Sequence, residues 1–128
     1  GINEGNFTTW HPGQRAFVEH LRTPDKGTGR PYALRYSGAM VADVHRTLLD
    51  GGIFMYPADM SDPAKPKPKL RLLYAVAPMA FLAEQAGGRA STGTERVLEL
   101  TAKEYHQRAA ILIGSAEDVT LAESFYRR

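Results

Sequence analysis

The chain has 128 residues, of which 43% are hydrophobic, and carries a formal net charge of +2 at pH 7. This length and apolar content fit a single domain, residues 1–128, with its own core. The absence of cysteine excludes a disulfide framework and a cysteine nucleophile, and the balanced charge gives no indication of nucleic-acid binding. Because no apolar stretch approaches the length of a membrane span, we expect a soluble cytoplasmic protein.

The first half of the chain predicts two helices, a strand and a loop. Apolar residues recur at helical spacing over Gln14–Leu21 and over Met40–Leu49, and the second helix is closed by the Gly51 and Gly52 pair. Residues Ile53–Tyr56 are typical of a short strand. The following segment, Pro57–Pro68, is proline-rich and contains exposed lysines, so we expect an irregular surface loop.

The second half is more apolar and predicts a further helix between strands. Within Leu70–Ala86 an internal proline requires the helix to begin near Ala77 or to bend there. Val97–Leu100 and Ala109–Ile113 indicate strands, and Ala116–Tyr126 indicates a last helix. The alternation of helices and strands predicts an α/β fold, a layered α/β domain with a mixed central sheet.

The chain lacks a clear catalytic constellation. Phosphate-ester hydrolysis commonly uses metals held by clustered carboxylates, but the aspartates fall on different predicted elements. Glu84, Glu95, Glu99 and Glu104 suit solvated faces, and His45 suits a structural role better than a catalytic one. The scattered aspartates are Asp43, Asp50, Asp59, Asp62 and Asp118.

Phosphate binding has better support than catalysis. Arginine, lysine, tyrosine and asparagine all donate hydrogen bonds to phosphate oxygens, and all four types stand near glycine turns and short apolar elements. In the alternative interpretation, the tyrosines pack in the core and the arginine forms a salt bridge. The candidate donors are Asn3, Arg35, Tyr36, Tyr56 and Lys69.

Five collinear blocks resemble the C-terminal half of class I fructose-1,6-bisphosphatase over nearly the whole chain. This resemblance implies the C-terminal half of a sugar-phosphatase fold and one half of a substrate site. The blocks are INEGN (Ile2 to Asn6), RYSGAMVADVHRTLLDGGIFMYPAD (Arg35 to Asp59), KLRLLY (Lys69 to Tyr74), PMAFLAEQAGGRASTG (Pro78 to Gly93) and HQRAAILIGS (His106 to Ser115).

The resemblance assigns roles to individual residues. It implies that Arg35 reaches into the neighbouring subunit's site in a homotetramer. It also implies that groups around Gly38 and Met40 face the sugar, while Leu70 and Arg71 follow the phosphate-binding lysine. The residues implied to bind the sugar 6-phosphate are Asn3, Tyr36, Tyr56 and Lys69.

Several departures separate phosphate binding from chemistry. Ala75 stands where the family has a glutamate that ligates a catalytic magnesium, and Asn6 stands where some relatives have a phosphate-contacting tyrosine. The family's N-terminal half, which supplies the other metal carboxylates, the 1-phosphate contacts and the AMP regulatory site, has no counterpart here. We therefore expect magnesium to serve the full-length parent rather than this chain, and the isolated chain to be inactive.

Three functions remain open at this point. The resemblance implies that the parent is a hydrolase of gluconeogenesis that converts fructose 1,6-bisphosphate to fructose 6-phosphate and phosphate. Ala75 supports an alternative, a sugar-phosphate-binding pseudoenzyme or regulatory protein. A structural module without a ligand is the third. Because Gly1 precedes Ile2 where relatives have serine, we expect a domain fragment, produced by cloning or proteolysis, whose exposed apolar face favours self-association.

Overall fold

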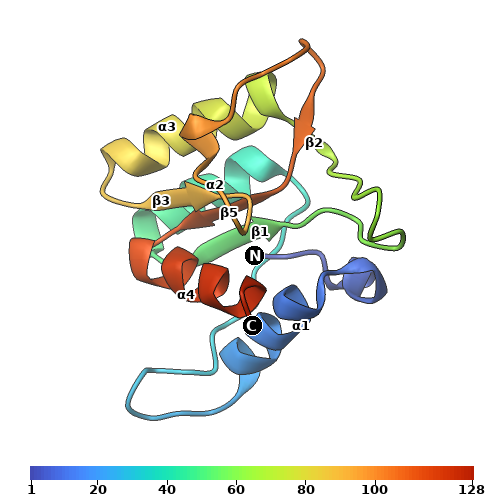
Figure 1. Ribbon diagram of the computed structural model, residues 1–128. Coiled ribbons are helices and arrows are strands. Elements are labelled where there is room, and N and C mark those ends of the chain that lie inside the picture. The colour runs from blue at the N-terminus through green and yellow to red at the C-terminus, as the bar shows by residue number, and fades with distance from the viewer.

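The computed structural model describes residues 1–128 as three layers, with a small sheet between two pairs of helices (Figure 1). Helices α1 and α4 pack on one face, while α2 and α3 pack on the other. The layered α/β architecture predicted from the sequence is confirmed. The sheet order is β1 (Ile53–Tyr56), β5 (Ile111–Gly114) and β3 (Arg89–Ser91), and the helices are α1 (Pro12–Arg22), α2 (Met40–Asp50), α3 (Ala77–Gln85) and α4 (Ala116–Tyr126).

Alternation along the central strands divides the core into two clusters. Ile53 and Met55 of β1 face α1 and α4, whereas Phe54 between them faces α2 and α3. Strand β5 repeats the pattern, with Leu112 in the first cluster and Ile111 in the second. Both pairs that β5 makes, with β1 and with β3, are antiparallel. A strand buried on both faces explains the unbroken apolar run of β5.

Local chemistry sets where the helices begin and end. Helix α1 starts at Pro12, two residues before the predicted Gln14, because the Nδ1 atom of His11 accepts a hydrogen bond from the Gly13 amide at 2.8 Å. Helix α2 ends where Gly51 adopts a φ of 79°, a conformation that favours glycine. No helix in the chain combines the length and the apolar character that a membrane span needs.

Helix α2 buries a different face from the one its apolar residues suggest. The buried residues are Asp43, Val44 and Thr47, whereas Val41 and Leu49 are 68% and 72% exposed. The apolar face predicted from the periodicity therefore exists, but most of it points to solvent. On the buried face, Val44 joins the core cluster, and the polar residues Asp43 and Thr47 lie beside it.

Other predicted elements are shifted or wrong. Val97–Leu100 is not a strand; a short 3-10 helix, Val97–Glu99, places Val97 in the core. The predicted strand at Ala109–Ile113 divides at Ala110 into β4 (Arg108–Ala109) and β5, which belong to different sheets. Strand β4 pairs with β2 (Leu70–Arg71), which leads through a π-helix, Leu72–Val76, into α3. Strand β3 and a 3-10 helix at Glu4–Thr9 were not predicted.

Candidate functional site

Tyr56 and Lys69 lie together at the edge of the central sheet. Strand β1 ends at Tyr56 because Pro57 cannot donate a ladder hydrogen bond. The proline-rich loop then returns the chain so that the Lys69 Nζ atom lies 5.9 Å from the centre of the Tyr56 ring. Both residues line a cavity of about 360 Å³, together with Asn6, Thr9, Pro57, Asp59, Lys67, Pro68 and Arg108.

Arg108 adds a cation that sequence reasoning did not single out. The β2–β4 pair sets Arg71 opposite Arg108, and the Arg108 guanidinium donates to the main-chain carbonyl of Lys69. Lys67, Lys69 and Arg108 surround the cavity, and Asp59 is the one acidic residue in its wall. This excess of positive charge favours an anion. The signal in the sequence was present, because Arg108 lies within the block from His106 to Ser115.

The pKa of Tyr36 is influenced by residues that line this cavity. Partial burial of this largely exposed residue raises the pKa of its hydroxyl, nearby Tyr56 and Asp43 add to the rise, and Lys69 opposes it. The Tyr36 phenol is therefore neutral at pH 7 and keeps its proton for donation. Tyr36 thus lies within electrostatic range of Tyr56 and Lys69, although it does not line their cavity.

Two other predicted positions have backbone roles near the start of α2. Gly38 has a φ of 84°, which bends the chain directly before the helix. Met40 is the first residue of α2 and packs against the core cluster beneath α2 and α3. The turn between them connects the segment that carries Tyr36 to the helix.

Asn3 and Asn6 stand at the two ends of one helical turn. The Asn3 Oδ1 atom accepts a hydrogen bond from the Gly5 amide at 3.0 Å and so caps the 3-10 helix, a contact that does not use its NH2 group. Asn6 lines the cavity beside Lys69. Asn6 thus presents a polar amide to this space.

Leu70 and Arg71 extend from Lys69 along β2. Leu70 is half-buried against the core cluster of α2 and α3. The Arg71 guanidinium lies 4.7 Å from the centre of the Tyr74 ring. Leu70 thus fixes the strand, and Arg71 is held on an aromatic surface outside the Lys69 cavity.

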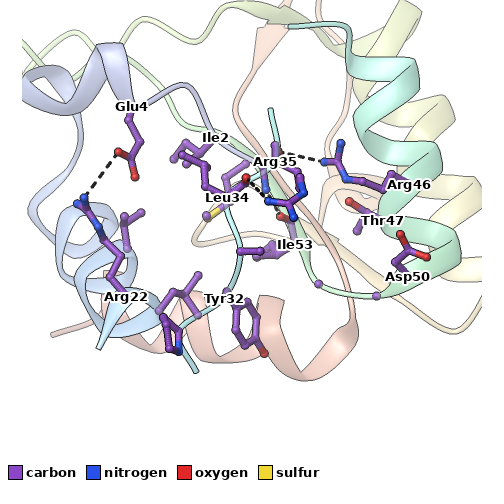
Figure 2. A pocket seen from close by; sticks show the side chains of 18 of the residues that line it. Ile2, Glu4, Arg22, Tyr32, Leu34, Arg35, Arg46, Thr47, Asp50 and Ile53 are labelled. Atoms are coloured by element: carbon purple, nitrogen blue, oxygen red, sulfur yellow. Dashed lines mark hydrogen bonds and ion pairs between the residues drawn. The ribbon is translucent and has the colours of Figure 1, made fainter. Parts of the chain in front are cut away.

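Arg35 lies apart from the Tyr56 and Lys69 cavity. It lines a larger groove of about 560 Å³ beside β1 and the N-terminus, where its guanidinium donates to the Leu34 carbonyl at 3.0 Å (Figure 2). The alternative in which Arg35 forms a salt bridge is not observed, since none of the ion pairs within the chain includes Arg35. The structure therefore divides the adjacent Arg35 and Tyr36 between two surfaces.

The chain offers no donor set that fits magnesium. Magnesium prefers carboxylate oxygens, but no group of three or more His, Asp or Glu side chains lies close enough to hold a metal ion. Ala75, in the π-helix, supplies only a methyl group. Glu84, which we expected on a solvated face, instead forms a two-pronged ion pair with Arg96.

The fold and the cavity define an α/β domain with a cationic pocket suited to an anion. A family model described as "Fructose-1-6-bisphosphatase, C-terminal domain" matches residues 1–127. The chain therefore belongs to the fructose-1,6-bisphosphatase C-terminal domain family.

Curated relatives and solved structures agree with this assignment. The class 1 fructose-1,6-bisphosphatase of Oleidesulfovibrio alaskensis is 51% identical over 99% of the chain and 38% of the relative. That of Chlorobaculum parvum is 49% identical over 97% of the chain and 36% of the relative. The Leishmania major enzyme in its T-state has a TM-score of 0.88 at 42% identity, covering 99% of this chain and 38% of the other. The chain thus spans less than two-fifths of these proteins.

Proposed function

We propose that this chain is the sugar-phosphate-binding part of a class 1 fructose-1,6-bisphosphatase. In this proposal Asn3, Tyr36, Tyr56 and Lys69 hold the 6-phosphate, so that the 1-phosphate meets chemistry supplied from outside the chain. The cavity that joins Tyr56, Lys69 and Arg108 carries the proposal, because it offers phenol and cationic donors to one anion. Magnesium would be held by residues beyond this chain, since its own residues do not fit the ion.

A binding measurement with a matched control tests this proposal. In the protein at its natural length, Lys69→Ala should weaken fructose 6-phosphate binding by about 1.5 to 3 kcal/mol, the scale of a lost charge-assisted hydrogen bond. Lys65→Ala removes the same charge from an exposed loop position outside the cavity and should leave affinity unchanged. Calorimetry measures both affinities. If the two variants weaken binding equally, Lys69 contributes only to the overall positive charge and does not contact the phosphate.

The position of Arg35 supports a proposal about assembly. Its guanidinium lies in a groove separate from the Tyr56 cavity, so an Arg35 that binds phosphate would serve a neighbouring subunit of a homotetramer. Arg35→Ala and Lys69→Ala subunits, each weak alone, should regain fructose 6-phosphate binding when mixed, because some hybrid sites contain both intact residues. If mixed oligomers regain nothing, Arg35 does not act across the boundary.

A second candidate, a pseudoenzyme that binds sugar phosphate without turnover, is favoured by Ala75 alone. The side chain cannot ligate a metal, so turnover would depend entirely on other carboxylates. Phosphate release from fructose 1,6-bisphosphate by the natural-length protein separates the two candidates. Ala75→Glu should increase the rate in an enzyme that lacks one ligand, and zero release from the wild type would favour the pseudoenzyme.

A further inference from the structure

We infer that Asp43 and Arg46 are positioning residues that orient Tyr36 for ligand binding. The inference rests on the proposed function, because it concerns the direction of a residue assigned to the phosphate. Neither charged residue touches the Tyr56 and Lys69 cavity. They lie one turn apart on α2 and act on the main chain that carries Tyr36.

The two peptide groups that flank Tyr36 are both held by this pair. On one side, the Ser37 amide donates to the Asp43 carboxylate, at 3.1 Å to Oδ1 and 3.2 Å to Oδ2. On the other, the Arg46 Nη2 atom donates to the Arg35 carbonyl at 3.1 Å (Figure 2). A second nitrogen of Arg46 donates to Asp43 at 2.9 Å and joins the two contacts. With both peptide planes fixed, φ and ψ of Tyr36 are fixed as well.

The surrounding segment has little else to hold it. Every residue from Pro31 to Ala39 is exposed, so the segment gains little from core packing. Its beginning is anchored by hydrogen bonds from the Tyr32 amide to the Leu21 carbonyl and from the Tyr32 hydroxyl to the Asp118 carboxylate. Its end is closed by the Ser37 hydroxyl and the Ala39 amide. At Tyr36 itself, orientation depends on the Asp43–Arg46 pair.

The burial of Asp43 is costly unless its contacts are made. Its side chain is fully buried, while Arg46 is 30% exposed and reaches it from the surface. A buried carboxylate loses hydration worth several kcal/mol and is stable only with good partners. The Asp43 carboxylate accepts three such contacts, two from the Ser37 amide and one from Arg46. The sequence thus places an ionised group under the segment where an apolar residue would fill the space but hold no peptide group.

The contact with Arg46 also affects Arg35. The peptide group that Arg46 holds also belongs to Arg35, so the contact that fixes the main chain at Tyr36 restricts Arg35 as well, whose side chain lines the groove beside β1. The pair therefore controls the direction of two proposed ligand residues at once.

The test uses fructose 6-phosphate binding by the protein at its natural length. Asp43→Asn removes the charge that retains Arg46 and should weaken affinity about tenfold, the scale of one charge-assisted hydrogen bond. Arg46→Lys keeps the positive charge but cannot span both Asp43 and the Arg35 carbonyl, so it should also weaken binding. Arg46→Lys remains informative if Asp43→Asn does not fold.

A double-mutant cycle separates positioning from general stability. In a Tyr36→Phe background, which lacks the phenol to be positioned, Asp43→Asn should cause a much smaller loss of affinity than in the wild type. A purely structural role gives equal losses in both backgrounds and would overturn the inference. Glu123→Gln is the matched control, because it alters another buried carboxylate, which contacts Arg89 and Ser91 and not the Tyr36 segment, and it should lower the Tm without changing affinity.

Two outcomes distinguish this inference from the proposal on which it rests. If the wild type binds no fructose 6-phosphate, the proposed function fails and the positioning role falls with it. If the wild type binds but Asp43→Asn and Arg46→Lys bind equally well, only the positioning role is wrong.

Discussion

Asp43 and Glu123 are the two buried carboxylates of this chain, and they lie on helices α2 and α4, which cover opposite faces of the sheet. Each pairs with an arginine at 2.9 Å, Asp43 with Arg46 and Glu123 with Arg89. Glu123 connects α4 to β3, which are both parts of the packed body, whereas Asp43 connects α2 to an exposed segment. The same kind of ion pair therefore joins two packed elements at Glu123, whereas at Asp43 it holds an exposed segment in place.

The largest expected effect is on stability at Glu123. Glu123→Ala removes the acceptor of both the Arg89 guanidinium and the buried Ser91 hydroxyl, so we expect the free energy of unfolding to fall by about 3 kcal/mol. Urea unfolding measures the loss, and fructose 6-phosphate affinity at a temperature where the variant is folded should not change. A parallel loss of affinity would show that the two regions are not independent.

Asp43→Ala should destabilise less and weaken binding more. The Ser37 amide and the Arg46 guanidinium lie near solvent and can turn to water, so we expect a stability loss of about 2 kcal/mol. Amide hydrogen exchange should become faster at Ser37 while the amides of β5 remain protected. Unchanged exchange at Ser37 would contradict the anchoring role of Asp43.

The contribution of Asp43 to stability should depend on pH, because its pKa differs between the folded and unfolded states. Burial opposes ionisation of Asp43, but hydrogen bonds from Arg46 and Ser37 outweigh it and lower its pKa below the ordinary 3.8. A lowered folded-state pKa means that the ionised group stabilises the fold above pH 3.8 and that this contribution is lost as the pH falls below that value.

The difference in stability between the wild type and Asp43→Asn should therefore shrink as the pH decreases from about 5 to below the folded-state pKa. Thermal unfolding at successive pH values measures it, with Asp62→Asn as an exposed control. A difference that stays constant with pH would mean that folding does not lower the pKa of Asp43.

The sequence predicted elements whose causes are local and missed those whose partners are distant. Strand β1 and helix α4 have the predicted bounds, because Pro57 and the Gly114 break lie beside them. Strand β3 escaped prediction because its polar Ser91 is satisfied by Glu123, 32 residues away. Val97 contributes one buried side chain from a 3-10 turn, which an apolar run cannot distinguish from a strand.

The candidate site divides in the same way. Tyr56 and Lys69 were proposed as ligands from their residue types and from the family resemblance, and their roles stay predictions. Arg108 joins them only through the β2–β4 pair, and Asp43 gains its importance only when Ser37 folds back onto α2. Composition and periodicity could not predict either contact, because each contact depends on the path that a loop takes through the fold.

The smallest effect is expected on the solvent side of α2. Leu49 is 72% exposed, so Leu49→Ser should change the free energy of unfolding of the 128-residue chain by less than about 0.5 kcal/mol. Val44→Ala, on the buried side of the same helix, should cost roughly 1.5 to 2.5 kcal/mol. Urea unfolding at several protein concentrations compares them. A larger, concentration-dependent loss for Leu49→Ser would show that copies of the chain bury this face against each other, as its uncovered apolar residues Val41, Leu48 and Leu49 would favour.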